Sequence, residues 1–282
     1  MRRITAFFCA LALWVGMGSV ALAGETRVTW HGHATFQVVT PNGTVFLIDP
    51  WLTNPKNPVH AEGGDALGAI GKVDYILLTH GHFDHVGDAV SVARRTGARL
   101  ISGFELGQNL AKLQGFPKEQ MGFDTLINPG GEIAVADGEV LVAMTPAVHS
   151  SGLGNPFADE NQPDHVYGGA PGGFVLEIQG GPTLYASGDT AYFSDMALIG
   201  KRFKVTVALV NIGGHFGMEA PMGARAAKAV RAKYAVAHHY GTFPVLTPDT
   251  EGFQHHLKKT GVRFLDLAPG ETVVFDGTKP VR

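Results

Sequence analysis

The sequence predicts an α/β fold in which two β-sheets lie between layers of helices. Short apolar runs bounded by Gly, Pro, Asn and Asp are typical of strands, and they are mixed with helix-like segments along the chain. This mixed order recurs in two similar halves, which favours two sheets with helices packed outside them. A chain of 282 residues is also long enough to bury one large core.

The first half contains four expected strands and one expected helix. The strands are residues 26–30, 34–40, 44–48 and 73–78, and the helix is residues 86–96. Pro41-Asn42-Gly43 is typical of a hairpin turn, and Gly97 suits the C-terminal end of the helix. The fourth strand is rich in Val, Ile and Leu, as expected for a strand covered on both faces.

The second half repeats the pattern. The expected strands are residues 174–178, 183–186, 205–212, 234–237, 262–267 and 271–275, and the expected helices are residues 221–232 and 249–260. Two long segments, residues 50–71 and 150–173, are rich in Gly, Pro, Asn and Asp and show no periodicity. Long loops in a compact domain are usually functional, so we expect walls of a site, with plain surface loops as the alternative. We interpret the glycine-rich residues 168–173 as a flexible loop.

The N-terminus is typical of an export signal. Arg2 and Arg3 precede an apolar stretch, and the small residues around Ala23 suit a signal peptidase. We therefore expect residues 1–23 to be a signal peptide, residues 24–282 to be a single domain, and the protein to be secreted or periplasmic. An uncleaved anchor is the alternative, although the apolar stretch is shorter than the roughly 20 residues of a membrane span.

Composition narrows the chemistry. Cys9, the only cysteine, lies in the expected signal, so the mature chain has neither disulfides nor thiolate ligands. Without Arg2 and Arg3, 20 basic residues face 25 acidic ones, and no Lys/Arg-rich run is present, which argues against nucleic acid as a partner. Thirteen histidines point instead to metal binding through nitrogen and oxygen.

A dense group of metal-binding residue types follows the fourth strand. The segment His80-Gly81-His82-Phe83-Asp84-His85 leaves the strand through an extended backbone, in which alternate side chains face the same way. His80 and His82 can therefore bind one metal ion. Asp84 and His85 come where the chain turns into the helix and can face a second ion. Ions in two-metal hydrolases are about 3.5–4 Å apart.

Two ions need more ligands than these four residues supply. His149 follows an apolar run, Asp189 directly follows an expected strand, and His239 lies at the end of another. A lone histidine is more often a surface or structural residue. Several metal-binding residue types at strand ends, together with one dense cluster, favour a metal centre at one edge of the sheets.

The complete pattern resembles the metallo-β-lactamase superfamily. The His-x-His-x-Asp-His spacing, with His149, Asp189 and His239 after it, carries this resemblance. Residues 30–34 (WHGHA), 49–50 (DP), 188–193 (GDTAYF) and 239–244 (HYGTFP) resemble one branch of it. That branch contains uncharacterised metal-dependent hydrolases, the ascorbate-phosphate lactonase and, more distantly, N-acyl-phosphatidylethanolamine phospholipase D. The resemblance implies a four-layer αβ/βα sandwich.

The resemblance also implies a ligand set and a mechanism. His80, His82 and His149 would hold a first ion, Asp84, His85 and His239 a second, and Asp189 would bridge both. We expect zinc, with manganese or iron as alternatives. The ions would share a hydroxide that attacks the substrate. Asp84 would act as the catalytic residue that orients the hydroxide and passes a proton to the leaving group.

Other histidines lie in stretches that match the branch. His33 and His215 are candidates for contacts behind the ligands or with substrate, whereas strand alternation directs His31 and His238 away from the site. His165 is expected at the surface, although its place in the second long loop makes a substrate contact conceivable.

The leading hypothesis is an exported metal-dependent hydrolase of a small-molecule ester, lactone or phosphoester. The alternatives are a β-lactamase and a non-catalytic metal-binding protein that kept the fold. We expect no stable membrane anchor, because no amphipathic basic helix is evident. The sequence does not indicate the oligomeric state.

Overall fold

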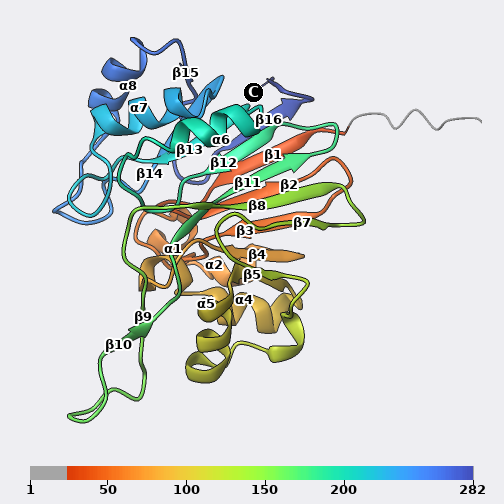
Figure 1. The fold of residues 1–282 in the computed structure, drawn as a ribbon, viewed down its shortest axis with the longest axis vertical. Helices are drawn as coiled ribbons and strands as arrows, with labels where there is room; N and C mark the ends of the chain where they lie inside the picture. Colours follow the sequence, from red (N-terminus) through yellow and green to blue (C-terminus); the bar gives the residue numbers. More distant parts are fainter. Residues whose placement is uncertain (1–23, 282) are drawn as a thin grey trace, which may run out of the picture.

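The computed structural model describes residues 24–281, and the expected signal peptide, residues 1–23, lies outside this range. Two large mixed sheets form the centre of the fold, and helices cover their outer faces (Figure 1). This confirms the predicted α/β sandwich. No helix among residues 24–281 has the length and apolar character needed to cross a bilayer.

The first sheet has eight strands in the order β17-β16-β1-β2-β3-β4-β5-β6. Strands from β17 to β3 pair antiparallel, whereas β3 to β6 pair parallel. The strands are β1 (Thr26–Trp30), β2 (Phe36–Val39), β3 (Val45–Ile48), β4 (Tyr75–Leu78), β5 (Arg99–Gly103), β6 (Leu126–Ile127), β16 (Thr272–Asp276) and β17 (Lys279–Pro280).

The second sheet has seven strands in the order β15-β14-β13-β12-β11-β8-β7. Its strands β7 to β12 pair antiparallel and β12 to β15 pair parallel, so each sheet has one antiparallel and one parallel half. The strands are β7 (Glu132–Val135), β8 (Val140–Pro146), β11 (Gly172–Ile178), β12 (Thr183–Ala186), β13 (Val207–Asn211), β14 (Tyr234–His238) and β15 (Arg263–Phe264).

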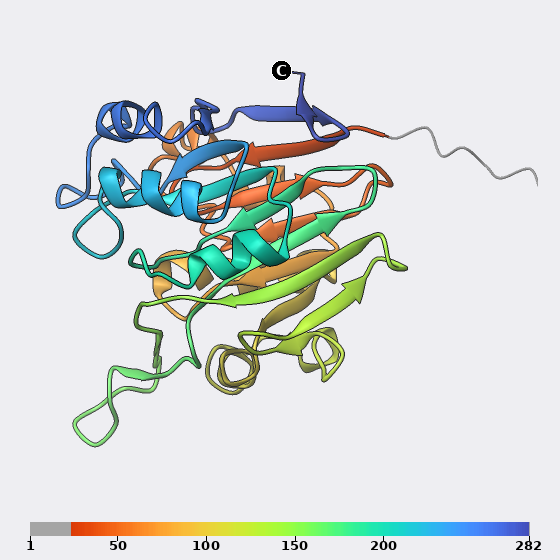
Figure 2. The same cartoon turned by 45° about the horizontal axis from the view of Figure 1, so that its top comes forward.

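Three apolar cores hold the layers together. Strand alternation in β3 shows how, because Phe46 and Ile48 face the core between the sheets while Val45 and Leu47 face the core under the helices. Burial on both faces explains the apolar character of these parallel strands. A third core joins the outer face of the second sheet to α6, α7 and α8, completing the four layers (Figure 2).

The helices are short. They are α1 (Pro58–Ala61), α2 (Ala66–Ala69), α3 (Phe83–Val86), α4 (Ala89–Thr96), α5 (Phe104–Asn109), α6 (Met196–Arg202), α7 (Ala220–Ala229) and α8 (Glu251–Leu257), with a π-helical turn at Leu110–Gln114 and a 3₁₀ turn at Lys118–Gln120. The predicted helix at residues 86–96 is confirmed as α4 from Ala89 onward, but its first residue, Val86, ends α3, and a break separates the two helices. The break lies at Asp88, whose carboxylate accepts hydrogen bonds from the backbone and side chain of Thr53. Gly97 ends α4 in the left-handed conformation, as predicted.

The two long segments are more ordered than the sequence indicated. Residues 50–71 contain α1 and α2, and residues 150–173 form a hairpin of β9 (Gly152–Gly154) and β10 (His165–Tyr167). This hairpin projects from the body of the domain (Figure 1). The interpretation of residues 168–173 as a flexible loop was wrong for its end. Gly172 and Gly173 are buried in β11, and a Cβ on Gly173 would lie 2.6 Å from the carbonyl oxygen of Ala186.

Candidate metal centre

The segment after β4 carries four of the predicted site residues. β4 ends at Leu78, and His80 and His82 follow in the connection to α3. His82 precedes the first residue of α3 and has an extended backbone, while Asp84 and His85 lie inside this helix. His80, Asp84 and His85 are buried, whereas His82 is partly exposed.

Three more predicted residues arrive from the other sheet. His149 follows β8, Asp189 follows β12 and His239 follows β14. The carboxyl ends of the parallel strands in both sheets therefore meet at one edge, which is where α/β proteins commonly bind ligands. The structure brings all seven predicted ligands together in overlapping groups of metal-binding atoms, and His33 joins them.

Three imidazoles form the first group, which we call the three-histidine group: His80, His82 and His149. The Nε2 atom of His80 lies 2.9 Å from Nδ1 of His82, and that same Nδ1 atom lies 3.3 Å from Nε2 of His149. One Nδ1 atom carries at most one proton, so it cannot donate to both neighbours. A shared cation accounts for three ring nitrogens at these separations.

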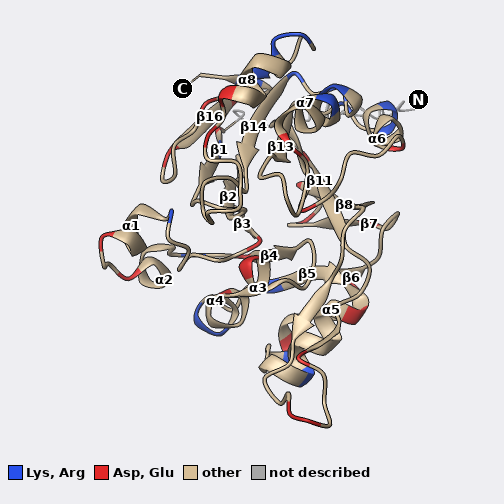
Figure 3. Cartoon of the chain, turned by 90° about the vertical axis from the view of Figure 1, so that its left-hand side faces the viewer, with Lys and Arg blue, Asp and Glu red and all other residues tan. Residues whose placement is uncertain are grey.

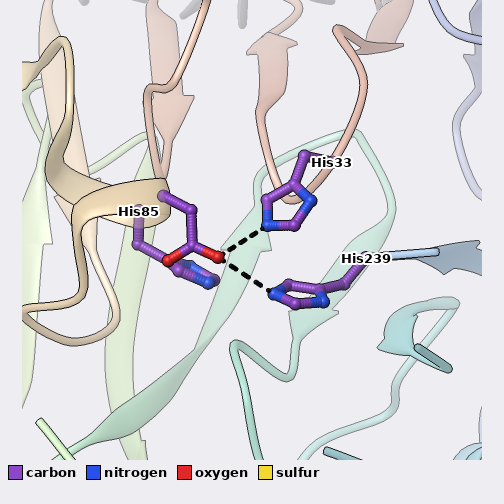
Figure 4. Close-up of side chains that lie close together, drawn as sticks. His33, His85 and His239 are labelled. Atoms are coloured by element: carbon purple, nitrogen blue, oxygen red, sulfur yellow. Dashed lines mark hydrogen bonds and ion pairs between the residues drawn. The ribbon is translucent and has the colours of Figure 1, made fainter. Parts of the chain in front are cut away.

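The second group, which we call the buried group, contains His33, Asp84, His85 and His239. The Oδ2 atom of Asp84 lies 2.9 Å from Nε2 of His33 and 3.5 Å from Nε2 of His239. Figure 4 shows His33, His85 and His239 reaching toward one place from separate segments of the chain. All four residues are buried.

Asp189 lies between the two groups. Its Oδ1 atom is 3.6 Å from Nε2 of His85, and its Oδ2 atom is 3.0 Å from Nε2 of His239 and 3.8 Å from Nε2 of His149. One carboxylate therefore faces residues of both groups. This is the position that the resemblance to the superfamily implied for a bridging ligand.

Atoms without partners test whether these residues suit a metal ion. Nε2 of His85, Oδ1 of Asp189 and Nε2 of His239 are buried and make no hydrogen bond. Buried polar atoms are almost always paired, so three such atoms in one place point to a missing ligand. Nitrogen and oxygen atoms bound to one tetrahedral zinc ion lie roughly 3.4 Å apart. The separations of 3.0 to 3.8 Å around Asp189 fit that geometry.

The pKa shifts in the buried group also indicate that its residues suit a bound cation. Burial lowers the pKa of His239, but the carboxylates of Asp189 and Asp84 raise it by a larger amount, so that the net pKa is about 9. Burial likewise lowers the pKa of His85, and the carboxylates of Asp189 and Asp49 more than compensate, so the net pKa is raised. Without a cation, these two imidazoles hold protons beside the carboxylates. A metal ion bound here would displace those protons.

The three-histidine group behaves differently. Burial lowers the pKa of His80, and the neighbouring His85 lowers it further. Burial also lowers the pKa of His82 and of His149. These three imidazoles are therefore neutral at neutral pH, which is the state in which a ring nitrogen can bind a metal ion.

The backbone is strained where the groups meet. His33, Asp49 and His239 have positive φ angles of 49°, 45° and 61°, which residues other than glycine seldom adopt. The backbone amide of His239 donates a hydrogen bond to the carbonyl oxygen of His33, which helps to hold both residues in this backbone conformation. Gly188 also has a positive φ, and a Cβ there would lie 2.7 Å from Cβ of Thr79. Strain of this kind is typical of functional sites.

Asp49 is a functional residue that the sequence interpretation missed. It is buried, and Oδ2 accepts hydrogen bonds from Nδ1 of His85, at 2.8 Å, and from the Thr79 hydroxyl, at 2.7 Å. These bonds direct Nε2 of His85 toward Asp189. The Asp49-Pro50 pair was recognised only as part of the branch resemblance. Its position directly after β3, at the same sheet edge, is the signal that could have assigned it a role.

His33 is placed behind Asp84 and is fully buried. Its Nδ1 atom lies 2.9 Å from the Thr242 hydroxyl and its Nε2 atom 2.9 Å from Asp84. A proton on Nε2 satisfies both contacts, because the hydroxyl can then donate to Nδ1 and Nε2 can donate to the carboxylate. Burial lowers the pKa of His33 to about 4, so this neutral form is the one present at neutral pH.

The structure does not bring His215 into either group. Its side chain is exposed and lines a separate hollow with Glu219 and Thr247, although its ring contacts Phe216. His31 and His238 also lie outside the groups: His31 contacts Gln37, and His238 packs against Phe36. From their sequence positions alone, His33 and His215 were equal candidates for contacts behind the ligands or with substrate.

A cavity of about 550 Å³ opens beside the two groups. Its lining includes Asp84, Asp189 and three of the histidines already described, together with residues from other segments. The additional residues are Phe83, Ser150, His165, Phe216 and Phe243. Ser150 and His165 come from the second long segment, which therefore forms one wall. His165 is exposed as expected and also borders the cavity.

Comparisons with known proteins show the family of this chain. Residues 44–240 match the family model described as a beta-lactamase superfamily domain. The chain is 51% identical over 257 residues to a UPF0173 metal-dependent hydrolase of Anaeromyxobacter sp. strain K, covering 90% of this chain and 89% of the relative. It is 45% identical over 256 residues to a UPF0173 metal-dependent hydrolase of Thermodesulfovibrio yellowstonii, covering 90% and 94%.

Solved structures give the same result. Igni18, a metallo hydrolase from the archaeon Ignicoccus hospitalis, is 34% identical with a TM-score of 0.74, covering 89% of this chain and 98% of Igni18. The metallo-beta-lactamase fold protein YhfI of Bacillus subtilis is only 13% identical, with a TM-score of 0.63 over 89% of this chain and 100% of YhfI. The second comparison supports the fold alone.

Proposed function

This chain belongs to the metallo-β-lactamase superfamily and is a metal-dependent hydrolase, and from that premise we propose that it uses two divalent ions to hydrolyse a small ester, lactone or phosphoester. The observation that carries the proposal is the position of Asp189. Its two carboxylate oxygens face imidazoles of both groups, and one of them, Oδ1, makes no hydrogen bond. A carboxylate placed in this way can serve two ions.

The three-histidine group would hold the first ion. Asp84, His85 and His239 would hold the second, with Asp189 common to both. Ligands of this type suit zinc, and manganese or iron as well. Hydrogen bonds from partners behind two of these ligands fit this assignment: His33 supports Asp84, and Asp49 supports His85. Residues that bind metals are commonly oriented by such partners.

When bound, two ions would supply a nucleophile at neutral pH by lowering the pKa of water, and would stabilise negative charge on the substrate. The chain contributes the remaining functions. Asp84 borders the cavity, and its carboxylate can orient the attacking water and then pass a proton to the leaving group. His33 fixes the orientation of that carboxylate through its 2.9 Å hydrogen bond.

Export is a further part of the proposal. Arg2, Arg3, the apolar stretch after them and the small residues before Gly24 support a signal peptide that ends at Ala23. The metal centre would then work outside the cytoplasm. The absence of cysteine ligands suits that environment, because thiolates are open to oxidation there.

One preparation tests both parts. Metal-replete protein purified after export should contain close to two ions per chain by elemental analysis, and chelation should abolish hydrolysis of a panel of esters, lactones, phosphodiesters and nitrocefin. Its intact mass should correspond to a chain that begins at Gly24. Saturation at one ion would overturn the two-metal proposal, hydrolysis of nitrocefin alone would make the protein a β-lactamase, and an intact Met1 would overturn signal cleavage.

A further inference from the structure

Phenylalanines from three separate segments line the cavity beside the metal centre. Phe83 is the first residue of α3, Phe216 follows β13 and Phe243 follows β14. The side chains of Phe83 and Phe216 are 65% and 57% exposed, so neither is used to fill a core. Large apolar side chains exposed together beside a polar centre commonly mark a binding surface.

Two of these rings are held in place. Phe83 and Phe243 both pack against Trp51, with ring centroids 5.7 and 5.8 Å away, and Phe243 also contacts the ring of His33. The apolar surface is therefore attached to the same side chains that support the buried group. Phe216 differs, because its one described aromatic contact is with the exposed His215.

The cavity lining contains no permanently cationic side chain among the described residues. Among the described residues that line it, two are aspartates and none is Lys or Arg. Figure 3 shows basic residues spread over outer elements such as α4 and α7. Sites that recognise phosphate usually place Arg or Lys around it, in addition to any metal ion. The lining offers no such group to the part of a substrate that lies beyond the metal centre.

We propose that this cavity selects uncharged carboxylic esters or lactones with an apolar substituent that lies on Phe83, Phe216 and Phe243, in preference to phosphoesters. The proposal rests on the proposed hydrolase function and narrows its substrate class. Water gives a proton to the Asp84 carboxylate as its oxygen adds to the carbonyl carbon, the acyl–oxygen bond breaks, and Asp84 passes that proton to the departing alkoxide, which leaves a carboxylic acid and an alcohol. A volume of about 550 Å³ suits a small molecule with a chain of several carbons or one ring.

Matched substrates with the same leaving group test this selectivity. Zinc-loaded protein should hydrolyse 4-nitrophenyl acetate, butyrate, hexanoate and octanoate with a kcat/KM that rises about two- to fourfold per methylene until the cavity is filled. Rates for 4-nitrophenyl phosphate and bis(4-nitrophenyl) phosphate, each corrected for the uncatalysed rate, should be at least about a hundredfold lower. A flat chain-length series or a preference for either phosphate would overturn the substrate class.

Phe216→Ser separates the apolar surface from the metal centre. We expect it to reduce the rise per methylene to less than about twofold and to lower the rate with octanoate more than the rate with acetate, while metal content stays that of the starting protein. Phe123→Ser is the matched control, because Phe123 is 90% exposed and lies outside the cavity lining. An equal loss of chain-length dependence in both variants would contradict the assignment of Phe216.

Binding gives a readout that is independent of turnover. Alkyl phenyl ketones of increasing chain length, which cannot be hydrolysed, should bind more tightly with length in calorimetry, to zinc-loaded and to chelated protein alike. Phe216→Ser should weaken the binding of the longest ketone several-fold. Ketone binding without hydrolysis of any substrate would refute the proposed function and leave the apolar surface intact. Metal-dependent phosphodiester hydrolysis without length-dependent binding would refute the inference alone.

Discussion

The two halves of the metal centre are built differently. The three-histidine group contains no carboxylate of its own, and two of its members, His82 and His149, are partly exposed at the cavity. The buried group contains Asp84, and all four of its residues are buried, although Asp84 and His239 border the cavity. Both groups face Asp189, so the difference between them lies in charge, burial and support.

Support is the clearest contrast. In the three-histidine group, His80 has the neutral Thr79 hydroxyl 3.0 Å from its Nδ1 atom, and His82 has the exposed Ser150 hydroxyl 3.2 Å from its Nε2 atom. In the buried group, Asp49 orients His85 and His33 orients Asp84, through hydrogen bonds of 2.8 and 2.9 Å. A buried, preoriented and negatively charged site binds a divalent cation more tightly than an exposed neutral one. We therefore expect the buried group to release its ion last.

Asp189→Ala should have the largest effect, because it removes the one residue common to both groups. We expect weak or partial occupancy of both sites and loss of hydrolysis by at least about three orders of magnitude, since the two-metal arrangement itself is lost. Elemental analysis and activity of the same sample measure this. Asp195→Ala, at an exposed aspartate outside both groups, is the control. Complete loss of one ion with full retention of the other would show that Asp189 does not bridge.

Asp49→Asn should weaken the buried group more than the three-histidine group, because Asp49 contacts His85 directly and reaches His80 only through the Thr79 hydroxyl. Asparagine tolerates the left-handed backbone of this position and keeps an oxygen for the amide of Thr79, but it removes the charge opposite His85. Loss of such a partner typically weakens metal binding about 10- to 100-fold. Metal content across a chelator series measures the change.

A mirrored variant sharpens this test. Ser150→Ala removes the polar support of His82 and should weaken the three-histidine group by less than about threefold, because that hydroxyl is exposed. Crystal structures of each variant at one ion per chain show which group has lost its ion. Release from the same group in both variants would contradict the contrast between them.

Most of the fold and of the metal centre could be predicted, for identifiable reasons. Continuous apolar runs, which reflect burial on both faces, make strands such as β3 and β4 recognisable. The His-x-His-x-Asp-His spacing is dense enough to be specific. The break at Asp88 could not be predicted, because it depends on a hydrogen bond to Thr53, which belongs to a different segment. The hairpin of β9 and β10 has no apolar alternation, so its sequence resembles a loop. The role of Asp49 likewise depends on where β3 lies beside β4.

His33 and His215 show the limit most directly. Both lie near strand ends and both have positive φ angles, of 49° and 45°. Their burial is opposite, since His33 is fully enclosed and His215 is exposed. The decisive partners of His33 are Asp84 and Thr242, which are 51 and 209 residues away along the chain. A local sequence pattern carries no information about contacts at that separation.

The remaining prediction concerns this pair. His33→Ala should keep two ions and lose about 10- to 100-fold in turnover, because Asp84 remains a ligand but loses the donor that orients it. His33→Gln should recover part of that loss, since its amide can donate where Nε2 did and both variants carry the same backbone strain. His215→Ala, at the same backbone conformation, should change turnover by no more than about threefold, through Phe216 alone.

Steady-state kinetics with elemental analysis on all three variants decides the question. Loss of an ion in His33→Ala would make His33 a direct ligand, and failure of His33→Gln to exceed His33→Ala would show that the ring fills space and does not orient Asp84 through its hydrogen bond.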